Sequence, residues 1–316
     1  MQAKRDKRNF RLALGAAVTA LLTLSASAHA TLTDPPDPDD DIVVNGIQTT
    51  KAAIADFIKN TIAPPKGGRH QGQYARFASP ICPKVTGLSK ANIAQVEERM
   101  RGVALAADMT VAAEGCKPNI FVMVVADGSE AISLLRKKNP RVFGALSLPE
   151  RARIADQGGP AYGWKRVQES SAENGALFNS DDAVVLPGDA QEKTEVATLN
   201  SHVKSRIKRT VQQSMTHSFL LLERDALVDL TTVQIADYAA MRSYIDTSDG
   251  DAQSPPPFSI LALFEDQGAN VPESVSEMDL ILLSSLYHSP ADVSASMQSA
   301  AMLNRIQKEL TSEKGD

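Results

Sequence analysis

The sequence predicts an α+β fold in which a mixed or antiparallel sheet packs against several helices. One observation is a run at residues 119–127 that is apolar enough to form a strand buried on both faces. A second is the central region from residue 161, where alternating and apolar segments are separated by Gly, Asn and Asp clusters, as is typical of antiparallel strands. Helical periodicity lies outside the central region, before residue 161 and from residue 231 onward. This arrangement in blocks favours α+β over a regular α/β alternation.

Helices are expected on both sides of the central strands, at residues 51–62, 89–107, 127–138, 148–156, 231–245, 259–264, 276–288 and 291–310. Three of them begin with a polar residue followed three positions later by Glu or Gln, which is the spacing of a helix cap. These pairs are Asp127 with Glu130, Thr231 with Gln234, and Ser274 with Glu277. No repeat is visible, so we expect one domain over residues 48–311, followed by a disordered tail at 312–316.

The first 30 residues have the pattern of a secretory signal peptide. A basic segment at residues 4–11 precedes an apolar segment at 12–24, and Ala28-His29-Ala30 supplies the small residues of a cleavage site. An uncleaved membrane anchor needs about 20 apolar residues, and this segment is shorter. We therefore predict cleavage after Ala30, no transmembrane segment in the mature chain, and a periplasmic or secreted protein.

Removal of residues 1–30 changes the charge of the chain. The whole sequence has 33 basic and 38 acidic residues, and the leader contains 5 and 1 of these, so the mature chain has 28 against 37, a net charge of −9. Nucleic-acid binding requires a basic face that neutralises phosphates. The composition therefore argues against a nucleic-acid partner.

Residues 31–47 are expected to form a disordered acidic leader with a short β segment. Five aspartates and three prolines lie between positions 34 and 41, and like charges with proline keep a chain extended. Ile42, Val43 and Val44 form the first segment able to add to a sheet edge, either as the first strand of the domain or in a partner.

The segment Asp41 to Gly46, DIVVNG, resembles a short box that follows the signal peptide in outer-membrane receptors and other exported proteins of sphingomonad-like alphaproteobacteria. In the receptors this box pairs with an energy-transducing periplasmic protein. The resemblance implies an envelope protein partner for Ile42, Val43 and Val44. A chain of this length with long helical segments does not fit a large receptor barrel.

The mature chain contains two cysteines, Cys82 and Cys116, both in loop-like surroundings. An even number in an oxidising compartment predicts one disulfide. The bond would close a loop of about 35 residues and contribute on the order of 3 to 4 kcal/mol in the chain-entropy model.

The sequence contains no familiar catalytic or cofactor motif. It has no G-x-S-x-G elbow, P-loop, G-x-G-x-x-G or H-E-x-x-H. The four histidines after the leader, at positions 70, 202, 217 and 288, are far apart in sequence, so we predict neither a metal nor a cofactor.

A dispersed hydrolytic site remains an alternative, because triads assemble across a fold and not along a chain. Its candidates are Asp127 and Ser129, at the end of the apolar strand, with His202 or His217 as the base. Asp127 has a competing interpretation as a helix cap. Ser201 and Lys204 match S-x-x-K, but they lie in an alternating segment that predicts a strand, where residues three apart face opposite sides.

The order of segments after residue 90 resembles a family of exported alphaproteobacterial proteins of unknown function with a zincin-like, metalloprotease-derived fold. The resemblance includes the strand at 119–127 and the helix beginning at Thr231. A zincin places two histidines and a glutamate on that helix. Gln234, Ile235 and Tyr238 stand here instead, so the resemblance implies a degenerate domain without the catalytic residues.

These observations favour an exported cell-envelope protein that is non-catalytic or serves as a binding module. The alternative is a periplasmic hydrolase with a dispersed Ser/His/Asp site.

Overall fold

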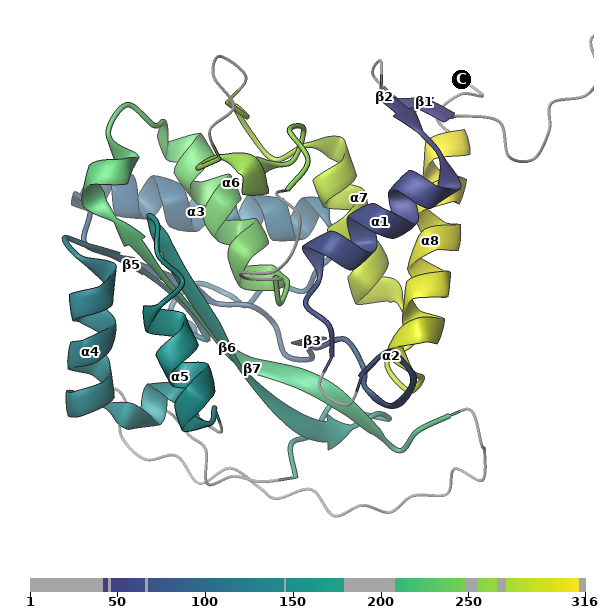
Figure 1. The fold of residues 1–316 in the computed structure, drawn as a ribbon, viewed down its shortest axis with the longest axis horizontal. Helices are drawn as coiled ribbons and strands as arrows, with labels where there is room; N and C mark the ends of the chain where they lie inside the picture. Colours follow the sequence, from purple (N-terminus) through teal and green to yellow (C-terminus); the bar gives the residue numbers. More distant parts are fainter. Residues whose placement is uncertain are drawn as a thin grey trace, which may run out of the picture. The chain divides into compact units, whose positions relative to one another are not determined.

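The structure is a computed structural model that describes residues 42–44, 47–65, 68–144, 146–178, 208–247, 255–265 and 271–312 (Figure 1). The predicted signal peptide, nearly all of the acidic leader, most of the tail and His202 lie outside these residues. Among the described helices, none combines the length and apolar character needed to cross a membrane.

A mixed five-stranded sheet forms the centre of the fold. The long strand β7 (Val211–Glu223) pairs with β6 (Ala161–Ser171) in antiparallel fashion, and with β3 (Arg76–Phe77) and β5 (Ile120–Val125) in parallel fashion. β4 (Pro83–Thr86) lies parallel to β5. The predicted α+β class with a mixed sheet is confirmed, while the expectation of antiparallel pairing holds only for β6 and β7.

Helices cover both faces of the sheet and create two apolar cores (Figure 1). Along β5 the side chains alternate between them: Ile120, Val122 and Val124 enter the larger core, whereas Phe121 enters the smaller one. Alternation follows from the two-residue period of a strand. Because both faces are covered, β5 is apolar throughout, as its sequence predicted.

The larger core is built from α1 (Lys51–Thr61), α3 (Lys90–Ala106), α6 (Thr232–Tyr244), α7 (Glu277–His288) and α8 (Ala295–Ser312). α6 lies against α3 and the 3-10 turn η3 (Ile260–Ala262), which occupies the place of the helix expected at 259–264. Nine residues of α6 are buried. This burial explains why its sequence consists largely of small or apolar groups.

The smaller core lies under α4 (Gly128–Lys138), the 3-10 turn η1 (Pro140–Phe143) and α5 (Leu148–Ala155). Aromatic rings stack across the sheet here, with Trp164 5.0 Å from Phe143 and 5.1 Å from Phe219 between ring centroids. The Trp164 indole donates to the carbonyl of Val142 at 3.1 Å. The only tryptophan in the sequence therefore joins the sheet to the turn after α4.

Two of the three predicted helix caps are confirmed. The Asp127 carboxylate accepts from the Glu130 amide at 2.7 Å, and Thr231 and Gln234 form a reciprocal capping box. The third prediction, Ser274 with Glu277, is wrong. Helix α7 is capped two residues later, because Ser276 and Asp279 accept from each other's amides at 3.1 Å.

The N-terminal described segment is a hairpin. β1 (Ile42–Val44) pairs with β2 (Ile47–Thr49) in antiparallel fashion, with Ile42 opposite Thr49. Ile42, Val43 and Val44 thus form a strand whose partner lies in the same chain. Two further short elements complete the fold: α2 (Gly68–Gln71) follows α1, and η2 (Arg224–Leu227) follows β7.

Candidate functional site

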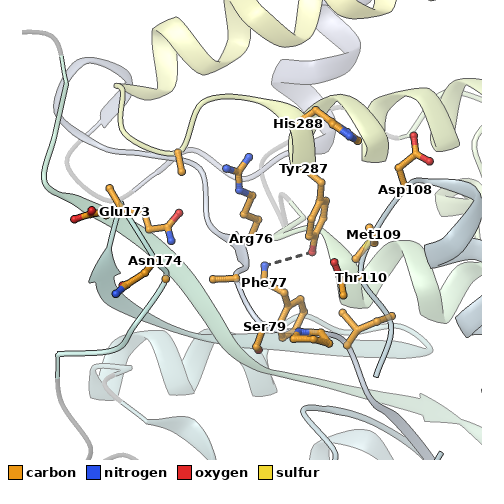
Figure 2. A pocket seen from close by; sticks show the side chains of 17 residues that line it. Arg76, Phe77, Ser79, Asp108, Met109, Thr110, Glu173, Asn174, Tyr287 and His288 are labelled. Atoms are coloured by element: carbon orange, nitrogen blue, oxygen red, sulfur yellow. Dashed lines mark hydrogen bonds between the residues drawn. The ribbon is translucent and has the colours of Figure 1, made fainter. Parts of the chain in front are cut away.

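A pocket with a volume of about 550 Å³ lies near the beginning of β7 (Figure 2). Segments that are distant in sequence meet around it: β3 and the loop after it, the turn after α3, the turn after β6, and the end of α7. We call it the Arg76 pocket. Its lining residues are 76–81, 108–110, 172–175, 212, 287, 288 and 291.

Arg76 holds one wall of this pocket in place. Its guanidinium group donates to the carbonyl oxygens of Leu286 at 2.7 Å and Ser289 at 2.5 Å. These carbonyls belong to the C-terminal end of α7, where the last carbonyl groups have no intrahelical partner four residues later. Burial lowers the pKa of Arg76. The arginine therefore serves as a cap that fastens β3 to α7.

Tyr287 joins the same wall to α6. Its hydroxyl donates to the Tyr244 carbonyl at 3.0 Å and accepts from the Phe77 amide at 3.4 Å, as Figure 2 shows for the second bond. Burial raises the pKa of Tyr287 well above its ordinary value, so the phenol stays protonated. The interior polar groups of the pocket wall are thus satisfied by the protein itself.

The opposite wall is the turn after β6. Gly175 has φ of +72° and donates to the Ser171 carbonyl at 2.8 Å, while Asn174 accepts from the Ala176 amide. A side chain at Gly175 would lie 3.1 Å from the Ala78 side chain. This turn therefore needs glycine both for its backbone conformation and for close packing against the loop after β3.

The rim of the pocket carries exposed polar side chains from separate segments: Ser79, Asp108, Thr110, Glu173, Asn174 and His288. His288 Nδ1 lies 2.9 Å from the Ser284 carbonyl oxygen, which can only accept. Nδ1 must therefore carry a proton, and in the neutral ring Nε2 has its lone pair available to accept a hydrogen bond.

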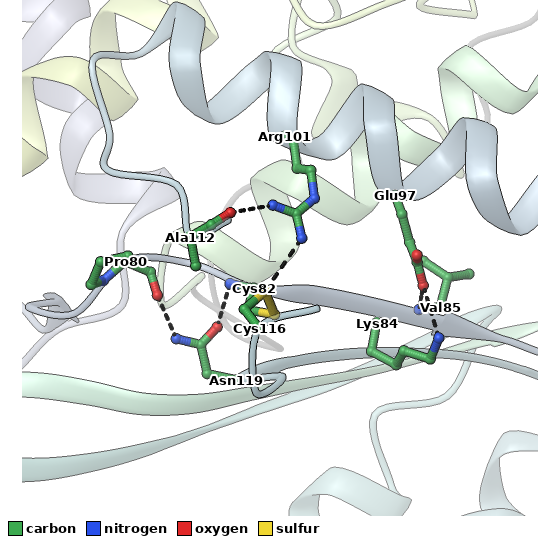
Figure 3. The surroundings of a disulfide bond; sticks show 9 residues. All are labelled: Pro80, Cys82, Lys84, Val85, Glu97, Arg101, Ala112, Cys116 and Asn119. Atoms are coloured by element: carbon green, nitrogen blue, oxygen red, sulfur yellow. Dashed lines mark hydrogen bonds and ion pairs between the residues drawn. A yellow bond between two sulfur atoms is a disulfide. The ribbon is translucent and has the colours of Figure 1, made fainter. Parts of the chain in front are cut away.

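The disulfide lies next in sequence to one lining segment of the pocket, which ends at Ile81. Cys82 and Cys116 are bonded as predicted, with Cα atoms 6.1 Å apart. Arg101 donates to Cys116 Sγ at 3.4 Å and to the Ala112 carbonyl at 2.6 Å, and Asn119 accepts from the Cys82 amide (Figure 3). The bond fixes the segment after α3 beside the start of β4, which follows Cys82 directly.

The structure separates the residues proposed for a hydrolytic site. Asp127 and Ser129 are exposed at the C-terminal end of β5, whereas His217 stacks on Phe121 at the beginning of that strand, with 6.3 Å between ring centroids. Five strand steps between Ile120 and Val125 span roughly 17 Å. His202 lies outside the described residues. Asp127, Ser129 and His217 are therefore not brought together.

The environment of Asp127 is that of a helix start. Glu223 at the end of β7 accepts from the Gly128 amide at 2.9 Å and from the Tyr162 hydroxyl at 3.3 Å. Burial, followed by the charges of Glu223 and Asp127, raises the pKa of Tyr162. A side chain at Gly128 would overlap the Tyr162 ring, with 2.1 Å to its nearest atom.

The helix compared with a zincin helix carries a buried ion pair. Asp237 is fully buried and accepts from Arg99 Nε at 2.7 Å and Nη2 at 2.8 Å, and also from the Val275 amide at 2.8 Å. The bond to Asp237 raises the pKa of Arg99. Tyr238 packs edge-on against Phe264. Asp237 is therefore a satisfied core residue that links α6, α3 and the start of α7.

Within the described residues, no group of three His, Cys, Asp or Glu side chains is placed to hold a metal ion. Comparisons with protein-family models, curated proteins and solved structures found no match. The zincin-like and alphaproteobacterial resemblances therefore stay predictions.

The sequence reasoning missed the Arg76 pocket. Its rim residues are ordinary polar types in four segments, and no spacing within the chain connects them. His288 was the one pocket residue with a recognisable local pattern. It lies at the end of a strongly apolar helix, where a basic side chain near the last carbonyls is expected.

Proposed function

We propose that this chain is an exported cell-envelope binding protein whose Arg76 pocket holds a saccharide. The observation that carries the proposal is that the polar groups of the pocket are of two kinds: some are bonded to the protein, and others are exposed at the rim. Arg76 and Tyr287 hold the walls through backbone groups, whereas Asp108, Glu173 and His288 are exposed polar residues at the rim.

The size and chemistry of the pocket support this ligand class. A volume of about 550 Å³ falls in the range of small-molecule sites. Carboxylates, an imidazole nitrogen and the hydroxyls of Ser79 and Thr110 accept hydrogen bonds, and the hydroxyls together with the Asn174 amide also donate them. A sugar ring offers several hydroxyls, each able to donate and accept, so it matches this mixed set better than a purely anionic ligand would.

The predicted export supports an envelope setting. A disulfide such as Cys82–Cys116 persists in oxidising compartments. Export is tested by expressing the whole chain and determining the N-terminus of the periplasmic protein by mass spectrometry, where Thr31 is expected as the first residue.

Ligand binding is tested by isothermal titration calorimetry with the N-acetylglucosamine tetramer and with maltotetraose. The variant Asp108→Asn/Glu173→Gln removes both rim carboxylates while keeping side-chain shape, and asparagine tolerates the φ of +56° at position 108. The matched control is Asp56→Asn/Glu98→Gln, which neutralises two exposed acids on α1 and α3.

We expect one of the probes to bind, with at least tenfold weaker binding in the pocket variant and unchanged binding in the control. Binding of neither probe, or equal binding by the two variants, would contradict the proposal. Spermine is titrated as a third ligand. If it binds and neither saccharide does, the pocket would be assigned to cations. Cleavage of a probe that is lost in His288→Gln would favour the alternative, a hydrolase.

A further inference from the structure

The helical layer formed by α4, η1 and α5 differs in charge from the rest of the chain. Residues 128–155 contain six basic and two acidic side chains, a net charge of +4, whereas the whole chain has a net charge of −5. α4 and α5 lie side by side (Figure 1). We call the basic side chains of this layer the basic face: Arg136, Lys137, Lys138, Arg141, Arg151 and Arg153.

A hollow of about 420 Å³ opens between the two helices. It is lined by Ser133, Arg136, Lys137, Leu148 and Arg151. Cations from both helices thus meet at one hollow, together with one hydroxyl and one apolar side chain.

The guanidinium group of Arg151, one of the cations of the basic face, is held in place by hydrogen bonds. It donates to the Leu146 carbonyl at 2.7 Å and the Gly144 carbonyl at 3.0 Å, and it lies 5.9 Å from the centroid of the Phe143 ring. The positive charge is therefore held at the hollow without a carboxylate partner. Within the described part of the chain, no carboxylate forms an ion pair with Arg136, Lys137, Lys138, Arg141 or Arg153 either.

Exposed leucines accompany these charges. Leu134 is 56% exposed and Leu148 is 72% exposed. Leu134 lies three and four positions before Lys137 and Lys138, and therefore on the same side of α4 as both. Leu148 lines the hollow itself.

A simpler explanation accounts for part of this pattern. Basic residues at the end of a helix interact favourably with the last carbonyl groups, and Arg136, Lys137 and Lys138 occupy the last turn of α4. Arg141 and Arg153 lie in the last turns of η1 and α5, so the same effect applies to them. It does not explain Arg151 at the hollow or the exposed leucines. At the hollow, Arg136, Lys137 and Arg151 lie beside the exposed Leu148, and cations next to an exposed apolar side chain are typical of surfaces that bind anionic lipid.

We propose that the basic face binds the anionic headgroup surface of a lipid membrane. The basic side chains contact lipid phosphates, with the hollow between α4 and α5 receiving one headgroup, and Leu134 and Leu148 enter the boundary between headgroups and acyl chains. The proposal is independent of the Arg76 pocket, because none of the residues of the basic face lines that pocket.

The test is vesicle co-sedimentation of the periplasmic protein, after its N-terminus has been determined. Vesicles contain phosphatidylcholine alone or phosphatidylcholine with one third phosphatidylglycerol. The variant Arg136→Gln/Lys137→Gln removes two charges of the basic face. The control Lys59→Gln/Lys90→Gln removes two exposed charges elsewhere, and Lys59, like the tested pair, occupies the last turn of its helix.

Wild-type protein should bind only the anionic vesicles. Each charge near the surface changes partitioning about fivefold, so the Arg136→Gln/Lys137→Gln variant should bind about 25-fold more weakly, with a smaller salt dependence. The Leu134→Ser/Leu148→Ser variant should also bind more weakly, but with an unchanged salt dependence. Circular dichroism of each variant checks that the fold is intact.

Two results would overturn the proposal. One is equal binding by the basic-face variant and the control, which would indicate non-specific attraction. The other is release from vesicles by millimolar inorganic phosphate with no effect of the leucine substitutions, which would make the hollow a site for free anions.

Discussion

Removal of the arginine that pairs with Asp237 should destabilise the whole fold. Asp237 is fully buried, and Arg99 supplies two of its three hydrogen bonds. In Arg99→Leu the carboxylate keeps only the Val275 amide. A buried charge that loses its partner must either remain ionised without compensation or take up a proton.

The expected loss follows from measured cases of broken buried ion pairs, which cost about 3 to 5 kcal/mol. The Arg99 side chain is 42% exposed, so water can reach the space that it vacates and can partly solvate Asp237. We therefore expect Arg99→Leu to lower the free energy of unfolding by about 2 to 4 kcal/mol. The second substitution in Arg99→Leu/Asp237→Asn removes the unpaired charge and should recover more than half of this loss.

The measurement is urea unfolding followed by circular dichroism, with the disulfide intact. Lys84→Gln is the matched control, because Lys84 pairs with Glu97 at 3.6 Å and is 51% exposed, and such surface pairs contribute about 0.5 kcal/mol or less. An unfolding free energy of Arg99→Leu within about 0.5 kcal/mol of the wild type would refute the assigned role of the pair.

Replacing both Cys82 and Cys116 by serine should lower the unfolding free energy by about 3 to 4 kcal/mol, measured by urea unfolding, and a reducing agent should then have no further effect. Gly128→Ala should cost about 1 to 3 kcal/mol by overlap with the Tyr162 ring, and Tyr162→Ala should remove most of that additional cost in a double-mutant cycle. Burial raises the pKa of Asp279 above its ordinary value of about 3.8, so its contribution to stability is full below that pH and is lost as the pH rises through the raised value. The stability of the wild type relative to Asp279→Asn should therefore fall as the pH rises above about 3.8, and a constant difference would contradict this.

Strand β7 illustrates which part of the fold the sequence can predict. Its first half, VQQSMT, is mixed in polarity, while its second half, HSFLLLE, is almost continuously apolar. The sequence therefore suggested two segments. In the structure the second half lies between β5 and β6 with helices over both faces, whereas the first half has only the two residues of β3 on one side. One strand thus passes through two environments.

Local signals predicted elements well and pairings poorly. Helix starts depend on residues within one turn, so Asp127 and Thr231 could be identified from spacing alone. The parallel pairing of β5 with β7 joins residues about 100 positions apart, and nothing within either segment specifies it. The hydrolytic site was predicted at the carboxyl end of β5, because ligands often bind at the carboxyl ends of strands in α/β sheets. The structure uses that end to start α4, and the only described histidine among the candidates lies at the other end of the strand.

The buried polar groups of α6 join this helix to the rest of the larger core. A helix that held a metal or a substrate would need polar atoms left open to the ligand, but Asp237 is closed off by Arg99 and Val275, and Tyr244 donates to the Met100 carbonyl at 2.8 Å. Each bond ties α6 to another element of the larger core, so a ligand at Asp237 would have to break a buried ion pair first. The Arg76 pocket and the basic face carry polar groups that the core does not use. Binding is therefore expected at these two places, and the variants Asp108→Asn/Glu173→Gln and Arg136→Gln/Lys137→Gln, which leave Arg76 and Arg151 in place, should change the unfolding free energy little.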